Sequence, residues 1–299
     1  TEAAAQVGQL FVVSNEDASL SRRDVLGNLK AERTAAAQCA RAAAVRCPAG
    51  EDPAHRGVRR RRRHRGRQAG GAFRASGRGS RLGSRAPKIL TKVAGLTMLD
   101  HLERLYRPHV DALVVVAHPS FAARVRSRLS AFGWKGSVVE QAEPTGMLDA
   151  ILLARDDVER AAPDRVWITW CDQIAMRPES IERLKALEEQ RPEAEVLMPS
   201  AAGAEPYTHL ERDASGRITR FLQRREGDAM PAHGESDAGL FSLPRDVFLD
   251  ALPAFASRAQ TGQGTSERNF VPFIVGRGVQ TSPVDVIEAT GVNTPGDLS

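Results

Sequence analysis

The sequence predicts an α/β fold with three layers, in which helices cover both faces of a mixed but mostly parallel sheet. Two observations lead to this prediction. From Lys88 onward, segments of strand length alternate with segments of helix length, which is typical of βαβ units. In addition, the segments 111–117 and 165–171 are mostly apolar, as expected for strands buried on both faces of a parallel sheet.

The first elements follow this alternation closely. Thr97 is a favourable N-cap residue, and the apolar positions after it recur on one helical face, so a helix is expected over 98–106. The same reasoning places strands at 111–117, 137–140 and 165–171, and helices at 121–132, 147–158 and 178–190.

The second half of the chain adds strands and a hairpin. Two segments with strand-like alternation, 207–212 and 217–221, flank the turn sequence Asp213-Ala-Ser-Gly216, which predicts a β-hairpin. A further strand is expected at 195–199 and a helix at 247–252.

Length and composition are those of a globular protein with a sizeable core. The chain has 299 residues, of which 41% are hydrophobic, enough for one large domain or for one domain with an appendage. No apolar run approaches the roughly 20 residues of a membrane span, and the first residues lack the basic and apolar blocks of a signal peptide. The three cysteines, Cys39, Cys47 and Cys171, have no metal-binding spacing. These features predict a cytoplasmic location and no membrane partner.

The chain is expected to divide at about residue 72. Residues 72–299 form the predicted α/β domain, and residues 1–71 form an Arg-rich, partly disordered N-terminal extension. Within this extension, 9–14 has the composition of a short buried strand and 20–35 that of a helix. The segment 68–74 is poor strand material because it contains two adjacent glycines and an arginine.

Arginines occupy every position from 59 to 63 in a chain whose formal net charge is +5. Such a run is either an arm that binds nucleic acid or another anionic surface, or a solvated, disordered segment. We favour the solvated segment and expect no nucleic-acid partner. A third interpretation is that residues 36–72, which are rich in Ala, Arg, Gly and Pro and show no periodicity, are GC-rich DNA translated out of frame. Sequencing the coding DNA tests that interpretation.

The stretch 75–90 combines glycines, hydroxyl residues and basic residues. Glycines at 77 and 79 let the backbone approach a ligand closely, and successive backbone N–H groups in such a turn form a concave anion site. Arg81 and Lys88 add positive charge at two distances from it. The pattern predicts a loop that holds a polyphosphate, although it lacks the spacing of a P-loop or a dinucleotide fingerprint. The alternative is an ordinary flexible loop.

The same residues resemble a family signature. Ala75-Ser-Gly-Arg-Gly-Ser-Arg-Leu82, followed by Pro87-Lys-Ile-Leu90, is similar to the signature of the sugar-phosphate nucleotidyltransferases, a superfamily that includes MobA-like proteins. The similarity is greatest to the uridyltransferase domain that makes UDP-N-acetylglucosamine, and it covers about residues 72–299. It implies a Rossmann-like nucleotidyltransferase fold in which a β-hairpin contributes to sugar binding. It also implies strands at 235–243 and from Val284.

The resemblance implies a nucleotide site at the Gly-rich loop and after the strand 137–140. Gln141 would hydrogen-bond the edge of the base, and Gly146 would let the backbone pass close to it. The alternative is a strand-to-helix turn that contacts no ligand. The implied nucleotide-binding residues are Ala75, Ser76, Gly77, Arg78, Gly79, Ser80, Gln141 and Gly146.

Two oxygen-bearing side chains are candidates for a metal site. Asp172 follows the strand 165–171, and Asn293 precedes a Thr-Pro pair. By resemblance, both would be ligands of Mg²⁺, which prefers a few hard oxygen ligands together with substrate phosphates. The alternatives are a turn or cap residue for Asp172 and a helix cap for Asn293.

The resemblance also implies a sugar site built by the hairpin and the strand after it. Its residues would be Thr208, Gln223 and Asp237. Asp237 stands where an asparagine of the family commonly binds a sugar hydroxyl, and a carboxylate can accept that hydrogen bond but has no amide hydrogen to donate.

The implied reaction is Mg²⁺-dependent transfer of a nucleotidyl group from an NTP, with UTP favoured, to a sugar 1-phosphate, giving an NDP-sugar and pyrophosphate. Arg81 and Lys88 would be the catalytic residues. Arg81 and the loop amides would hold the β- and γ-phosphates, and Lys88 would steady the attacking or transferred phosphate. Two alternatives stay open: a cytidylyltransferase that uses CTP and a non-sugar phosphate acceptor, and a catalytically degenerate nucleotide-binding protein.

Overall fold

The computed structural model describes residues 9–13, 87–133, 136–143, 145–224, 227–258 and 270–292. The chain divides into two compact units, one made of 1–18 and 77–299 and the other of 19–76. All described residues belong to the first unit, which alone is discussed below. The expected helix at 20–35, the arginine run and the Gly-rich loop therefore lie outside the described residues.

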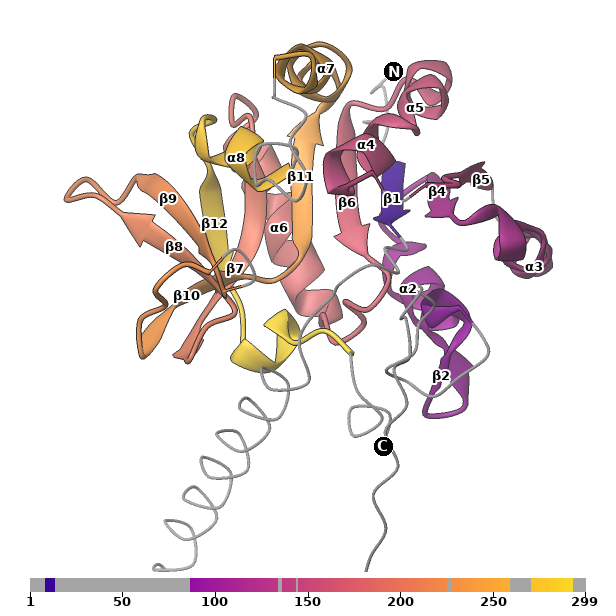
Figure 1. Cartoon of the computed structure of the whole chain (residues 1–299), viewed down its shortest axis with the longest axis horizontal. Coiled ribbons are helices and arrows are strands. Elements are labelled where there is room, and N and C mark those ends of the chain that lie inside the picture. The colour runs from indigo at the N-terminus through magenta and orange to yellow at the C-terminus, as the bar shows by residue number, and fades with distance from the viewer. Residues whose placement is uncertain are drawn as a thin grey trace, which may run out of the picture. The chain divides into compact units, whose positions relative to one another are not determined.

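A mixed sheet runs through the middle of the unit (Figure 1). Its strand order is β10-β7-β11-β6-β1-β4-β5, and β12 also pairs with β7. Pairing is parallel between β1 and each of its neighbours, between β4 and β5 and between β7 and β12, whereas β11 and β10 run antiparallel to their partners. The strands are β1 (Gln9–Val13), β4 (Ala112–Ala117), β5 (Gly136–Glu140), β6 (Arg165–Trp170), β7 (Leu197–Ala204), β10 (His233–Asp237), β11 (Leu240–Pro244) and β12 (Gln280–Pro283).

The central strand β1 comes from the amino-terminal end of the chain. It lies between β4 and β6, where Val12 pairs with Val115 on one side and with Thr169 on the other, and Figure 1 shows it in indigo between them. The sequence predicts that residues 1–71 form a separate extension, whereas in the structure β1 is part of the main sheet. The segment 10–13 is apolar and mostly β-branched or aromatic, which suits a central strand.

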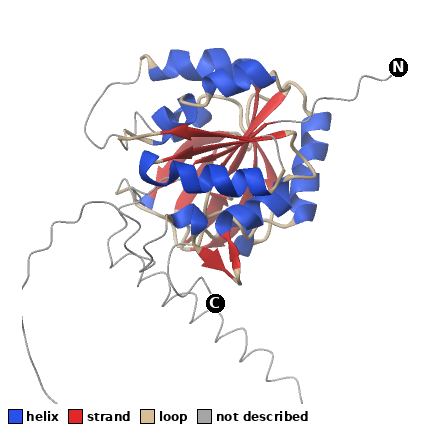
Figure 2. Cartoon of the chain, turned by 90° about the vertical axis from the view of Figure 1, so that its right-hand side faces the viewer, coloured by secondary structure: helices blue, strands red, loops and turns tan. Residues whose placement is uncertain are grey.

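Two groups of helices cover the two faces of the sheet, as Figures 1 and 2 show. Alternate residues of β4 point to opposite faces: Val114 and Val116 belong to one apolar cluster, Leu113 and Val115 to the other. The first cluster contains residues of α4 (Met147–Leu152), α5 (Arg155–Ala161), the π-helix η3 (Val247–Ala251), α7 (Leu252–Ala256) and α8 (Phe270–Val275). The second contains residues of α2 (Met98–Tyr106), α3 (Pro119–Ala131) and α6 (Pro178–Gln190). This arrangement confirms the predicted three-layer α/β class.

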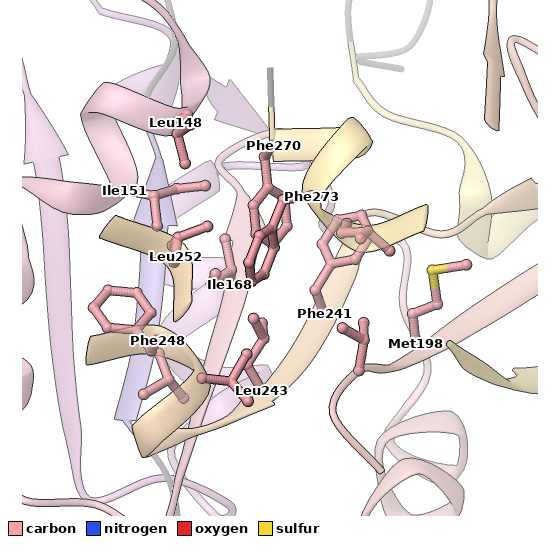
Figure 3. Packing of buried hydrophobic residues seen from close by; sticks show 14 of the residues in the cluster. Leu148, Ile151, Ile168, Met198, Phe241, Leu243, Phe248, Leu252, Phe270 and Phe273 are labelled. Atoms are coloured by element: carbon pink, nitrogen blue, oxygen red, sulfur yellow. The ribbon is translucent and has the colours of Figure 1, made fainter. Parts of the chain in front are cut away.

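Aromatic side chains fill the first of these clusters (Figure 3). Phe241 of β11 lies edge-on to Phe270 of α8, with ring centroids 5.3 Å apart and an interplanar angle of 88°. Leu148 and Ile151 of α4 are buried in the same cluster. The cluster thus joins the helices of this face to strands in the middle of the sheet.

Smaller elements surround the carboxyl edge of the sheet. They are the 3-10 helix η1 (Lys88–Leu90), the short pair β2 (Lys92–Val93) and β3 (Leu96–Thr97), the hairpin β8 (Thr208–Arg212) and β9 (Ile218–Gln223), and the 3-10 helix η5 (Val286–Ala289). The hairpin confirms the prediction from the Asp213–Gly216 turn. Thr97 caps α2 through a capping box with Asp100, as its sequence position suggested.

Three expected elements differ in the structure. The helix expected at 147–158 is divided into α4 and α5 near Ala154. The strand expected at 235–243 is divided into β10 and β11 at Gly239, whose φ is +68°. The strand expected from Val284 is instead η5, because Asp285 and Glu288 form a capping box that begins a helical turn.

Among the described helices, none combines the length and the apolar character that crossing a membrane requires.

Candidate functional site

The loops after β5 and β6 lie at one edge of the sheet. Both strands belong to the parallel set formed with β1 and β4, so their carboxyl ends meet at the same edge. Asp172 follows β6 and Gln141 follows β5. The turn between β10 and β11 reaches the same edge because β11 runs antiparallel to β6 and begins opposite its last residues. In open α/β sheets, ligands bind beyond this edge.

Lys88 and Asp172 meet at this edge although 84 positions separate them in the sequence. Lys88 Nζ lies 2.5 Å from Asp172 Oδ2, and the two side chains are only 15% and 16% exposed. Pro87, which directly precedes η1, has an extended backbone. Lys88 follows it and contacts the loop after β6 through Asp172. The contact therefore holds a cationic group and a carboxylate close together in a mostly buried position, where their attraction is stronger than in bulk water.

The last described residues are fixed against the same loop. Val292 N–H donates to the backbone oxygen of Asp172 over 3.1 Å. Glu288, which is 1% exposed, accepts hydrogen bonds from the backbone N–H groups of Arg177 (2.8 Å) and Asp285 (3.2 Å). Glu288 therefore ties η5 to the loop that follows Asp172. Asn293 comes next in the chain and lies outside the described residues.

The three residues expected to bind a sugar lie together. Thr208 and Gln223 are cross-strand partners in the hairpin, and Thr208 Oγ1 donates to Asp237 Oδ1 over 2.6 Å. Asp237 Oδ2 accepts from the backbone N–H of Gly239 over 3.0 Å. Burial raises the pKa of the Asp237 carboxyl above its ordinary value, and the bonds from Thr208 and Gly239 oppose that rise.

The loop after β5 is ordered by its own contacts. Gln141 N–H donates to the oxygen of Ala117, and the Gln141 amide lies 3.4 Å from Thr145 Oγ1. Gly146 precedes α4 with φ 134° and ψ 171°, a conformation that favours glycine. The predicted role of Gln141 and Gly146 in binding a base stays a prediction.

The remaining predicted residues lie outside the described part of the chain. Arg81 and Asn293 are among them, as are the loop residues Ala75, Ser76, Gly77, Arg78, Gly79 and Ser80. Of the predicted site, the structure therefore describes the surroundings of Lys88, Asp172, Gln141, Gly146, Thr208, Gln223 and Asp237.

Sequence reasoning missed two buried polar residues near this edge, Gln173 and Glu288. Gln173 is 9% exposed, and its Oε1 has no hydrogen-bond partner among the described residues. Its position directly after Asp172 was a signal that could have been used. The spacing between Asp285 and Glu288 is that of a capping box, but it gave no indication that Glu288 also contacts Arg177.

Comparison with known proteins gives the family. The model of the MobA-like NTP transferase domain matches residues 72–237. The chain belongs to this family. This membership confirms the predicted superfamily, the sugar-phosphate nucleotidyltransferases, and the enzyme class, a nucleotidyltransferase.

The MobA-like domain also has relatives among curated proteins. The bifunctional protein GlmU of Pseudomonas putida strain F1 is 28% identical over 234 residues, which cover 75% of this chain and 49% of that protein. The GlmU of Xanthobacter autotrophicus is 38% identical over 116 residues, covering 38% of this chain and 25% of that protein. The chain thus spans about half the length, at most, of these curated relatives.

A solved structure shares the fold. CMP:2-keto-3-deoxy-manno-octonic acid synthetase, complexed with CTP, superposes with a TM-score of 0.54 and 19% identity, covering 71% of this chain and 89% of that chain. At this identity the likeness concerns the fold alone, and it agrees with the predicted Rossmann-like nucleotidyltransferase fold.

Proposed function

We propose that this MobA-like domain transfers a nucleotidyl group from an NTP, with UTP favoured, to a sugar 1-phosphate. The observation that carries the proposal is the 2.5 Å contact between Lys88 and Asp172. These two residues were implied separately, one as a phosphate-binding lysine and one as a metal ligand, and they come from distant parts of the sequence. Their meeting at the carboxyl edge of the sheet supports a single polyphosphate site there.

The reaction needs no nucleophile from the protein. An oxygen of the acceptor phosphate forms a bond to the α-phosphorus of the NTP, and the bond from that phosphorus to the oxygen bridging to the β-phosphate breaks. Its electron pair leaves with pyrophosphate. The protein acts by positioning the two phosphates and offsetting their charge. Lys88 donates to a phosphate oxygen, and Arg81 with the amides of the Gly-rich loop holds the β- and γ-phosphates.

The donor set fits a magnesium ion that is shared with substrate. The described residues contain no group of three or more His, Cys, Asp or Glu side chains able to hold a metal. Asp172 and, next to Val292, Asn293 would be the protein ligands, and Mg²⁺ commonly binds through one or two carboxylates with substrate phosphates. The ion would supply charge neutralisation at the phosphates. Asp172 offers a hard carboxylate oxygen of this kind beside Lys88, and its side chain is 16% exposed.

The acceptor sugar would lie against the hairpin. Thr208, Gln223 and Asp237 are held together by strand pairing and by the bond from Thr208 to Asp237. Hydroxyl, amide and carboxyl groups in one place suit an acceptor with several hydroxyl groups.

The test is pyrophosphate release by the full chain with Mg²⁺, a panel of UTP, CTP, GTP, ATP and dTTP, and a panel of sugar 1-phosphates. We expect turnover with UTP and at least one sugar 1-phosphate, and loss of that turnover in Asp172→Asn. The matched control is Asp111→Asn, an exposed carboxylate just before β4 at the opposite edge of the sheet. Turnover with CTP and a non-sugar phosphate only would refute the sugar assignment, and no turnover with any pair would refute the proposed function.

A further inference from the structure

The side chain of Gln173 is buried but incompletely hydrogen-bonded. It is 9% exposed, and no described residue donates to its Oε1 atom. Leaving a buried acceptor without a donor costs about 1–3 kcal/mol, and native structures contain few such atoms. An unpaired amide oxygen in a candidate site therefore points to a donor that a ligand brings.

The position of Gln173 connects the two halves of the site. Its backbone follows Asp172 directly, and its side chain packs against Gly239, in the turn that begins with Asp237. A Cβ atom on Gly239 would lie 2.6 Å from Gln173 Cγ and 2.7 Å from Nε2. Gly239 is thus required both for its φ of +68° and for the space that the glutamine occupies.

The turn that Gln173 contacts is itself held rigidly. Thr169 Oγ1 of β6 donates to the backbone oxygen of Gly239 over 2.9 Å, and Asp237 accepts from the N–H of Gly239. The backbone N–H and carbonyl oxygen of Gly239 are therefore already engaged in hydrogen bonds. The terminal torsion of a glutamine is broad, so the amide can turn its oxygen towards a ligand without a change in the backbone.

We propose that Gln173 is a binding residue for the acceptor, whose hydroxyl group donates a hydrogen bond to the Gln173 amide oxygen. The proposal rests on the proposed function and adds a specificity-determining contact to it. The amide lies against the turn of Asp237, which is bonded to Thr208 of the hairpin, so it faces the sugar side of the site. The NTP phosphates are expected on the other side of Asp172, near Lys88.

The experiment uses Gln173→Met in the full chain, because methionine has similar length and no polar atom. We expect the KM for the acceptor to rise about tenfold, the size of effect that one lost hydrogen bond produces, while the KM for the NTP stays within a factor of two. Thermal stability should be unchanged or higher, since the variant removes an unpaired buried oxygen. The control is Gln280→Met, a partly buried glutamine on β12 at the opposite edge of the sheet.

Acceptors that lack one hydroxyl group provide a second measurement, on the wild-type protein as well. One deoxy acceptor should bind wild type more weakly, and Gln173→Met should weaken binding of that acceptor no further. An unchanged acceptor KM in Gln173→Met, an equal rise in both KM values, or no affected deoxy acceptor would each overturn the contact. Absence of turnover in wild type would instead refute the proposed function and this inference with it.

Discussion

Lys88 Nζ lies 2.5 Å from Asp172 Oδ2, and each side chain is about one-sixth exposed. The pair joins η1, which follows the Gly-rich loop in the sequence, to the loop after β6. For a mostly buried ion pair, removing one partner costs much more stability than removing both. The single removal leaves the other charge poorly solvated, whereas the double removal leaves no unpaired charge. The same pair places a cation and a carboxylate where phosphates and a metal are proposed to bind.

The first prediction separates the contribution of the Lys88–Asp172 pair to stability from its contribution to catalysis. Lys88→Met should lower the free energy of unfolding by about 3 kcal/mol, because it leaves the Asp172 carboxylate without this partner, and should lower pyrophosphate release by about 100-fold. Lys88→Met combined with Asp172→Asn should recover most of the stability but none of the activity. Urea unfolding and pyrophosphate release measure the two effects. Full activity in the single variant would remove Lys88 from the catalytic site.

The second prediction concerns Glu288 as a positioning residue. Its two oxygens accept from the backbone N–H groups of Arg177 and Asp285, and a glutamine retains only one of these acceptors. Glu288→Gln should therefore lower the free energy of unfolding by about 1–2 kcal/mol. It should also raise the Mg²⁺ concentration needed for half-maximal turnover, because η5 leads into Asn293.

Glu179→Gln is the control for Glu288, since Glu179 is exposed in the first turn of α6. Loss of stability without any change in the Mg²⁺ requirement would show that Glu288 is structural only.

The third prediction compares two glycines with positive φ. A Cβ on Gly216 (φ +83°) meets no atom within 4 Å, whereas a Cβ on Gly239 (φ +68°) lies 2.6 Å from Gln173 Cγ. Gly216→Ala should cost about 1–2 kcal/mol of stability from backbone strain alone. Gly239→Ala should cost about 1–3 kcal/mol more, because Gln173 must move. Equal unfolding free energies for the two variants would mean that Gln173 yields without cost.

The fourth prediction follows from the raised pKa of Asp237. Its ordinary value is 3.8, so in the unfolded chain the group loses its proton near pH 4, whereas in the folded protein it keeps it to higher pH. The protonated Asp237 carboxyl therefore adds its full contribution to the free energy of unfolding below pH 4. That contribution is lost as the pH rises through the pKa that Asp237 has in the folded protein. Asp237→Asn does not titrate and has no such loss.

The measurement is the urea midpoint of wild type and Asp237→Asn from pH 4 to pH 8. The difference in favour of Asp237→Asn should grow with increasing pH, while the slope of the free energy against urea stays the same. A difference that stays constant with pH would show that the folded carboxyl titrates at its ordinary value.

Local signals in the sequence predicted much of the fold. The N-cap at Thr97, the apolar run that became β4 and the turn at Asp213–Gly216 each depend on residues close in sequence, and each was confirmed. Two strands implied by the resemblance, at 235–243 and from Val284, differ in the structure. A positive φ at Gly239 divides the first, and a capping box begins a helical turn at Val286–Ala289 in the second.

Long-range relationships were harder to predict. The composition around 9–13 suggested a strand. No signal near it in the sequence indicates that this strand pairs with β4 and β6. The reason is that the connection between two parallel strands can have any length above about a dozen residues. In the same way, the Asp172 position was inferred from the strand that precedes it, whereas the unpaired amide of Gln173 depends on the conformation of Gly239 far along the chain.

The origin of β1 has a consequence for biosynthesis. During synthesis β1 is made before both of its neighbours in the sheet, since Val13 pairs with Val116 and with Trp170. A nascent chain that ends before Trp170 therefore exposes an apolar segment with an incomplete sheet, and such unpaired edges promote aggregation. Expression at low temperature, with chaperones or a solubilising amino-terminal fusion, should accordingly raise the yield of folded protein.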